Sequence, residues 1–288
     1  MQEFQHDGVT IAYERAGAGP ALLFLHNGGT SSTIWRKQVE ALSDSFTVVA
    51  VDLPGFGQSP RPAEGIDLGD QVALIAALIE ELDLAPVVMV GNCMGSNISA
   101  LVAAAHPELV RGLVLVNPLT EATFSAGGLG TFHKLERWAR GPSDVARRVS
   151  RKVVPPRLAA KATIRFQLGS KGAAAKLQND PGLIACNVRR DQMPALVDVL
   201  DDMHAYGALD DGRAGELPLC VVWGSQNRVL APKAMRALSA QLHPDREVVM
   251  DGCGHLPMLE DPERLTSIIE DFIVEVDARA ADAKVKTS

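Results

Sequence analysis

One cysteine of this chain stands in a sequence setting that suits a nucleophile. The stretch Gly-Asn-Cys-Met-Gly at residues 91–95 follows the apolar run 85–90, which predicts a buried strand, and precedes the helix-forming run 96–105. A strand that turns sharply into a helix at a Gly-x-nucleophile-x-Gly step is a nucleophile elbow, because glycines leave room where strand and helix cross. Cys93 occupies its apex, at a helix N-terminus that favours negative charge. We therefore expect Cys93 to be catalytic.

The elements before and after this step alternate between strand and helix. Apolar runs predict strands at residues 8–13, 21–25, 46–51, 85–90, 112–117, 218–223 and 247–250. Apolar residues at helical spacing predict amphipathic helices, of which 67–82 and 261–280 are the clearest. Strands that alternate with helices predict an α/β fold with a mainly parallel central sheet and helices on both of its faces.

The alternation stops between residues 118 and 215. This segment has no long β-run, and it holds helical stretches around 134–140, 142–151 and 193–206. We interpret residues 1–117 and 216–288 as the core domain. Residues 118–215, called the cap segment below, are predicted to form an inserted helical cap over the end of the sheet.

The composition excludes several classes of protein. A hydrophobic content of 47% and a charged content of 22% are typical of an ordinary globular chain. The net charge of −7 and the lack of a basic stripe disfavour nucleic acid as a partner. No apolar run approaches the ~20 residues of a membrane span. The polar N-terminus does not resemble a secretory signal, and the four cysteines are widely spread, so we expect a cytoplasmic protein without a metal or a cofactor.

Four stretches, taken in order, carry a resemblance to a known superfamily. They are Leu25-His26-Asn27-Gly28-Gly29, Asp52-x-x-Gly55-x-Gly57-x-Ser59, Gly91-x-Cys93-x-Gly95 and Gly252-Cys-Gly-His255. With these stretches the sequence resembles the capped branch of the α/β-hydrolase superfamily, over essentially the whole chain outside the cap segment.

The resemblance implies a catalytic triad in the order nucleophile, acid, histidine. The nucleophile position falls on Cys93 and the histidine position on His255. The acid position falls on Asn227, which is an amide, and a second place where some members carry the acid is Asn117, again an amide. Glu121, in the cap segment, is a weaker substitute. The resemblance also implies an oxyanion hole made of the Met94 N–H and one N–H of the Asn27-Gly28 turn.

A cysteine nucleophile and an asparagine in place of the acid are chemically compatible. An amide at the acid position should cost a serine enzyme orders of magnitude in rate. A thiol can instead exist as a thiolate beside an imidazolium, so that the third residue needs only to orient the ring. We therefore expect an acyl-transfer enzyme, a hydrolase or an acyltransferase, that forms a covalent thioester on Cys93.

The substrate is expected to be a small acyl ester or thioester, free or carrier-linked. Aromatic and histidine side chains of the cap segment could line its pocket or pack the cap itself: Phe124, Phe132, His133, Trp138 and His204. Two other readings stay open. One is a lyase or cyclase that uses His255 as an acid or base without an acyl-enzyme, and the other is an inactive paralogue that binds a ligand. The acyl acceptor and the oligomeric state also stay open.

Overall fold

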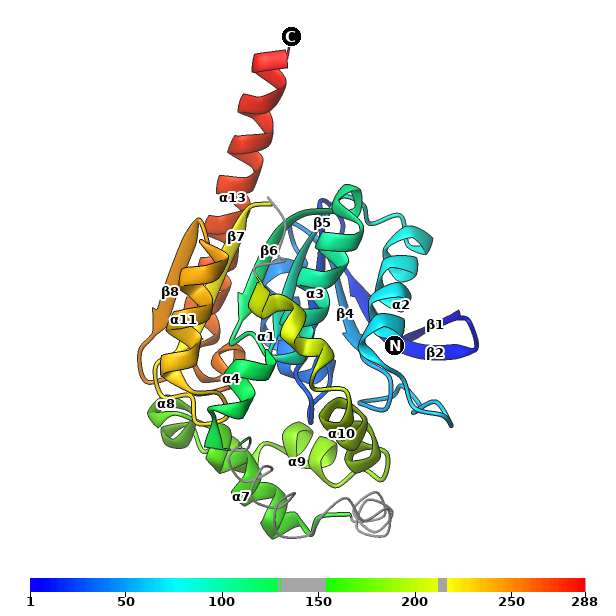
Figure 1. The fold of residues 1–288 in the computed structure, drawn as a ribbon, viewed down its shortest axis with the longest axis vertical. Helices are drawn as coiled ribbons and strands as arrows, with labels where there is room; N and C mark the ends of the chain where they lie inside the picture. Colours follow the sequence, from blue (N-terminus) through cyan, green and yellow to red (C-terminus); the bar gives the residue numbers. More distant parts are fainter. Residues whose placement is uncertain (129, 131–153, 212–216, 288) are drawn as a thin grey trace.

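The computed structural model describes residues 1–128, 130, 154–211 and 217–287, and an eight-stranded sheet runs through its centre (Figure 1). The strand order is β1-β2-β4-β3-β5-β6-β7-β8, with β1 and β2 antiparallel to each other, β2 antiparallel to β4, and every other pair parallel. The strands are β1 (Gln2–His6), β2 (Val9–Ala16), β3 (Ala21–Leu25), β4 (Thr47–Asp52), β5 (Val87–Asn92), β6 (Val110–Val116), β7 (Leu219–Gly224) and β8 (Arg246–Met250). The predicted mainly parallel α/β sheet is confirmed.

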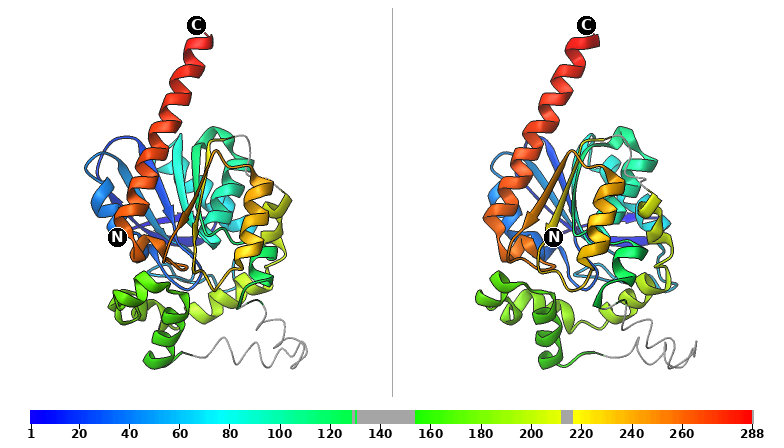
Figure 2. Two further views of the ribbon diagram at one scale, coloured as in Figure 1. Left: turned by 90° about the vertical axis from the view of Figure 1, so that its left-hand side faces the viewer. Right: turned by 60° about the vertical axis from the view of Figure 1, so that its left-hand side comes forward.

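Both faces of the central strands are covered by helices. Every residue of β4, β5 and β7 is buried, as expected for parallel strands with helices on both sides. Leu23 and Leu25 of β3 pack into one apolar cluster with α2 (Leu68–Glu81), α3 (Met94–Ala105) and α11 (Pro232–Leu242). Leu22 and Phe24 pack on the opposite face with α1 (Arg36–Leu42) and α13 (Pro262–Thr287). The views in Figure 2 show these two helix layers on either side of the sheet.

The described part of the cap segment is helical and lies at the end of the sheet where the parallel strands finish (Figures 1 and 2). It consists of α4 (Glu121–Ser125), α7 (Arg157–Gln167), α8 (Ser170–Ala174), α9 (Pro181–Asn187), α10 (Gln192–Asp201) and the 3-10 helices η3 (Leu177–Asn179) and η4 (Ala205–Asp211). The remaining short helices are η1 (Ser32–Trp35), η2 (Pro107–Leu109) and α12 (Pro257–Glu260). The helices predicted around 134–140 and 142–151 fall outside the described residues. The division into two domains stays a prediction.

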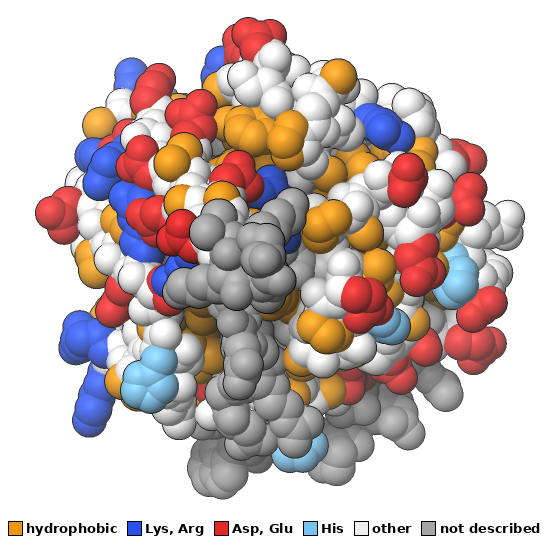
Figure 3. All heavy atoms as spheres, turned by 90° about the horizontal axis from the view of Figure 1, so that it is seen from above, with side chains coloured by type: hydrophobic (Ala, Val, Ile, Leu, Met, Phe, Trp, Pro, Cys, Tyr) orange, Lys and Arg blue, Asp and Glu red, His pale blue; other side chains and the backbone are white. Residues whose placement is uncertain are grey.

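The last helix, α13, is longer than the predicted 261–280 and reaches Thr287. Its buried apolar residues, from Leu265 to Val276, lie in its first 15 residues. The second half extends away from the sheet (Figures 1 and 2). In the part of the chain that the structure describes, no helix has the length and apolarity needed to cross a membrane. On the surface seen from above, acidic and basic side chains are interspersed (Figure 3).

Candidate active site

Cys93 lies at a sharp turn between β5 and α3, with φ 53° and ψ −110°. A positive φ is rare for a residue with a side chain, so this position is strained. A Cβ at Gly91 would lie 2.3 Å from the carbonyl oxygen of Gly95, and a Cβ at Gly95 would lie 2.4 Å from that of Leu25. Both glycines are therefore required by the close approach of strand and helix, and the geometry is that of the elbow.

The thiol of Cys93 is buried, which favours its protonated form. Its residue is 7% exposed. Burial raises the pKa of Cys93 to about 12, and the nearby N–H of Met94 opposes that rise only in part. The sequence led us to expect a helix N-terminus that favours the thiolate, but loss of water has the larger effect here.

His255 is buried too, and it is neutral. It follows β8, and its backbone N–H donates to the carbonyl oxygen of Gln167 in the cap segment at 2.7 Å. Burial lowers the pKa of His255 to about 3. Its Nδ1 has no hydrogen-bond partner among the described residues. The resting site therefore holds a neutral thiol and a neutral imidazole, rather than a thiolate and an imidazolium.

Asn227 lies in the turn after β7 and uses its oxygen within that turn. Its Oδ1 accepts hydrogen bonds from the N–H groups of Val229 at 2.9 Å and Leu230 at 3.3 Å. These two donors identify the side-chain oxygen, so the remaining atom is Nδ2, which is buried and has no partner in the described chain. The turn contacts the loop of His255 through the main chain, because the N–H of Gln226 donates to the carbonyl oxygen of Cys253 at 2.8 Å.

Two further asparagines hold the backbone of His255. Asn117 Nδ2 and Asn92 Nδ2 both lie 3.3 Å from the His255 carbonyl oxygen as donors. Asn117 Oδ1 also accepts from the N–H of Gly224 at 3.0 Å. Asn117 thus binds the main chain of His255. No role was predicted for Asn92 from the sequence, and its one signal there is its place directly before Cys93.

Glu121 and His204 meet at the surface. Glu121 Oε2 lies 3.2 Å from His204 Nδ1, and the His204 side chain is 98% exposed. Phe124, by contrast, is buried in the same apolar cluster as Cys93. The remaining pocket candidates, Phe132, His133 and Trp138, lie outside the described residues.

The loop expected to supply the second oxyanion N–H is fixed next to the elbow. The N–H of Gly95 donates to the carbonyl oxygen of His26 at 3.2 Å. His26 in turn bridges the loop, since its Nδ1 donates to the Asn27 carbonyl oxygen at 2.8 Å and its Nε2 accepts from the N–H of Leu53 at 2.9 Å. The cap segment covers this loop, because a Cβ at Gly28 would lie 3.3 Å from the side chain of Leu196. Met94, Asn27 and Gly28 therefore lie on two connected segments.

Like Asn92, Tyr206 had no role predicted from the sequence. Its side chain is fully buried in the cluster that contains Cys93, and its backbone carbonyl accepts from Asn97 Nδ2 on α3 at 3.0 Å. Burial is the main cause that raises the pKa of Tyr206, and the charges of Asp202 and Cys93 add to it. No sequence motif marks this residue.

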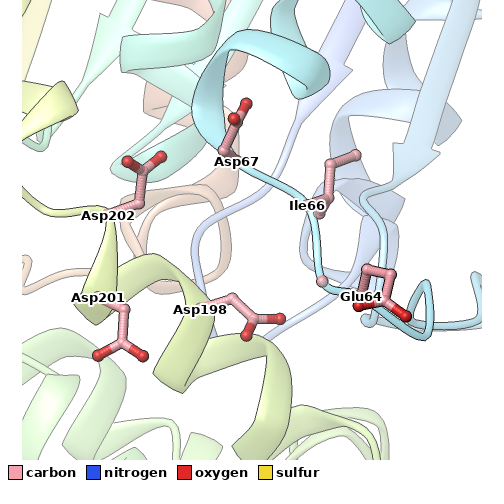
Figure 4. A pocket seen from close by; sticks show the side chains of 7 residues that line it. Glu64, Ile66, Asp67, Asp198, Asp201 and Asp202 are labelled. Carbon is pink, nitrogen blue, oxygen red and sulfur yellow. The ribbon is translucent and has the colours of Figure 1, made fainter.

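A separate acidic pocket of about 280 Å³ lies between the start of α2 and the end of α10. Its lining includes Glu64, Asp67, Asp198, Asp201 and Asp202, and Figure 4 shows these side chains spread around it rather than directed to one point. Across the described parts of the chain, no group of three or more His, Cys, Asp and Glu side chains is arranged to hold a metal ion.

This chain is similar in sequence and in fold to several known proteins. A 2-(acetamidomethylene)succinate hydrolase from Mesorhizobium japonicum is 27% identical over 283 residues, which cover 92% of this chain and 92% of that protein. A pimeloyl-acyl-carrier-protein methyl ester esterase from Aeromonas hydrophila is 29% identical over 293 residues, covering 92% of this chain and all (100%) of that one. The crystal structure of a bacterial membrane phospholipase A matches with a TM-score of 0.78 and 26% identity, over 96% of this chain and 86% of that one.

Residues 20–262 match the family described as the alpha/beta hydrolase fold. This range begins just before β3 and ends at the start of α13, so it contains the elbow, the turn of Asn227 and the loop of His255. The match covers strands β3 to β8 and leaves out β1, β2 and nearly all of α13. The chain belongs to the α/β-hydrolase fold family of enzymes.

Proposed function

We propose that the protein is an acyl-transfer enzyme that hydrolyses a small ester or thioester, or transfers its acyl group, through a covalent intermediate on Cys93. The observation that carries this proposal is the backbone at Cys93. A strained φ of 53° at a non-glycine residue has no benefit for packing, and such strain is typical of functional positions. The strain sets the thiol beside the N–H of Met94, where an oxyanion hole is needed.

The first half of the reaction forms the acyl-enzyme. Cys93 Sγ attacks the substrate carbonyl carbon, a bond forms between sulfur and carbon, and the carbonyl π electrons move onto oxygen. The proton of the thiol passes to His255 Nε2 as this bond forms. Because the resting thiol and imidazole are both neutral, proton transfer accompanies attack instead of preceding it. The tetrahedral intermediate then collapses, and the leaving group departs with the proton of His255.

The second half releases the product. Water or another acceptor attacks the thioester and gives its proton to His255, and collapse restores the thiol of Cys93. In both halves we propose that the oxyanion accepts hydrogen bonds from the N–H of Met94 and from one N–H of the Asn27-Gly28 turn. The hydrogen bond between Gly95 and His26 supports this, since it fixes that turn beside the elbow.

We propose Asn227 as the residue that orients the His255 ring. The main-chain contact between their loops supports this role, as do the buried atoms Asn227 Nδ2 and His255 Nδ1, which have no hydrogen-bond partner among the described residues. An amide adds no charge, and an Nδ2 donor favours the tautomer with the proton on Nε2, so the ring proton of His255 must move to Nδ1 before Nε2 can accept the proton of Cys93. Asn227 therefore assists general-base catalysis by His255 less than a carboxylate would.

The class of substrate is proposed from the relatives and from the site. Two relatives act, by name, on an acetamidomethylene succinate and on a methyl ester of a carrier-bound acyl group. Cys93 belongs to a buried apolar cluster that also contains Leu119 and Phe124, and apolar surroundings suit an acyl chain. The four cysteines are all free, which supports a reducing compartment such as the cytoplasm.

A lyase or cyclase is the second candidate, and the orientation of Asn227 favours it. If Asn227 Nδ2 donates to His255 Nδ1, the proton on Nε2 makes His255 a donor toward a substrate. Such a reaction needs no acyl-cysteine.

Intact-protein mass spectrometry distinguishes these functions. Wild type, Cys93→Ser and Cys93→Ala are mixed with acetyl, butyryl and hexanoyl thioesters of N-acetylcysteamine and with the matching p-nitrophenyl esters. We expect an acyl mass on wild type that is absent from Cys93→Ala. Product formation without an adduct, retained in Cys93→Ala, would replace the proposal with the lyase. Ligand binding without adduct or product would indicate an inactive paralogue.

A further inference from the structure

A buried carboxylate lies behind the loop of His255. Glu260 ends α12, five residues after His255, and is 7% exposed. Its Oε1 accepts hydrogen bonds from the N–H groups of Gly254 at 2.8 Å and Leu256 at 3.2 Å. These are the residues on either side of His255. One carboxylate oxygen therefore holds the backbone on both sides of the proposed base.

The other oxygen of the same carboxylate holds the cap segment. Glu260 Oε2 accepts from the N–H of Gly169 at 2.7 Å and from that of Gly172 at 3.3 Å. Both donors belong to the start of α8, about 90 positions away in sequence. Burial raises the pKa of Glu260, while these four N–H groups act in the opposite direction.

The two segments joined by Glu260 also contact each other directly. The N–H of His255 donates to the Gln167 carbonyl oxygen at 2.7 Å. A Cβ at Gly254 would lie 2.3 Å from that same oxygen, and a Cβ at Gly169 would lie 2.3 Å from the carbonyl oxygen of Gly252. The main chains are thus packed as closely as glycine allows, and the carboxylate closes their contact.

We propose that Glu260 is a positioning residue that fixes the loop of His255 against the cap segment, so that cap and base move as one unit. This inference rests on the proposed catalytic role of His255. Only a carboxylate offers two acceptor oxygens for two pairs of N–H donors. A glutamine would turn its NH₂ group toward one of the pairs and lose both of those hydrogen bonds.

The first test compares Glu260→Gln with Asp261→Asn. Asp261 is a matched control, because it pairs with Lys171 of the same helix, α8, but does not hold the backbone of His255. We expect Glu260→Gln to slow acyl-adduct formation on Cys93 by about 10- to 100-fold, since small displacements of a catalytic group have effects of this size. Asp261→Asn should change the rate by less than about twofold, because a partly exposed ion pair contributes little. Equal rates for the two variants would overturn the proposal.

A double variant separates positioning from general damage to the fold. In a His255→Gln background, Glu260→Gln should slow the residual acylation of Cys93 by less than about twofold, because residues that act through one another are not additive. If Glu260→Gln slows acylation by the same factor in both backgrounds, then Glu260 does not act through His255. If Glu260→Gln does not fold, Glu260→Asp replaces it, with one methylene less and the charge retained.

Hydrogen exchange tests the contact without any substrate. Glu260→Gln should raise the exchange rates of the Gly254, Leu256, Gly169 and Gly172 amides together, whereas Asp261→Asn should leave those of Gly254 and Leu256 unchanged. Unchanged exchange in Glu260→Gln would overturn the proposal. If wild type forms no adduct but Glu260→Gln shows this exchange, then the proposed function fails while the structural coupling holds.

Discussion

Asn92 Nδ2 donates to Asn27 Oδ1 at 3.2 Å, and this bond joins the residue before Cys93 to the loop of the proposed oxyanion hole. The same nitrogen is 3.3 Å from the carbonyl oxygen of His255. One buried amide therefore connects three separate segments of the candidate site. Their relative placement depends on a residue that takes no part in the chemistry.

Asn92→Ala should lower both stability and activity. It leaves Asn27 Oδ1 and the His255 carbonyl with one donor fewer, which should cost about 1–3 kcal/mol in the free energy of unfolding. Adduct formation on Cys93 should slow by about 10-fold or more. Asn187→Ala is the control, because Asn187 Nδ2 bonds within its own helix, to the Leu183 carbonyl oxygen. Urea unfolding and adduct kinetics measure the two effects, and a slowdown of the same size in the control would contradict this role.

Asn227→Asp should increase activity. One carboxylate oxygen can keep the hydrogen bonds to Val229 and Leu230, while the second is free to accept from His255 Nδ1. The pKa of His255 should then rise above its present value of about 3, and acylation of Cys93 should become about 10-fold faster or more. Adduct kinetics and the NMR titration of His255 measure both changes.

Asn227→Ala is the companion to this variant. It removes the turn hydrogen bonds and should lower the stability without increasing the rate. A folded Asn227→Asp protein with an unchanged rate would place Asn227 outside the catalytic group.

His255 should make the protein sensitive to acid. The folded chain keeps this side chain neutral down to about pH 3, whereas the unfolded chain binds a proton near 6.5. Because the unfolded state binds more protons between these values, the free energy of unfolding should fall by about 2 kcal/mol from about pH 7 to about pH 5 through His255 alone. Urea unfolding of wild type and His255→Gln at both pH values measures this difference. An identical pH dependence in the two proteins would argue against a neutral, buried His255.

The elbow should not tolerate alanine at either glycine. Gly91→Ala and Gly95→Ala place a Cβ 2.3 Å and 2.4 Å from backbone oxygen atoms, so each should lower the free energy of unfolding by more than about 2 kcal/mol. Gly69→Ala is the control, since its nearest neighbour would be 3.4 Å away in the first turn of α2, and it should be neutral or stabilising by about 0.5 kcal/mol. Thermal unfolding compares the three variants, and equal melting temperatures would contradict the steric reading of the elbow.

Local sequence predicted the sheet well, and it predicted a tight strand-to-helix turn at residue 93. Strands buried on both faces are continuous apolar runs, and β4 shows this in its six consecutive buried residues. The tight turn requires glycine at residues 91 and 95, and these two glycines can be recognised in the sequence itself.

The hydrogen bonds of the site could not be predicted from the sequence, because they join residues that are far apart along the chain. Glu260 meets Gly169 across 91 positions, and Asn92 meets His255 across 163. The raised pKa of the Cys93 thiol could not be predicted from the sequence either. The helix N-terminus of Cys93 can be predicted from its neighbours, but the burial that raises its pKa depends on packing of the whole chain.

The buried thiol also has a consequence for the survival of the protein under oxidative stress. Peroxides attack the thiolate, and a cysteine with a pKa of about 12 is almost entirely protonated at neutral pH. Cys93 should therefore resist conversion to sulfenic acid far longer than an exposed redox-sensor cysteine. In its proposed role as the nucleophile, Cys93 would therefore stay intact between substrates.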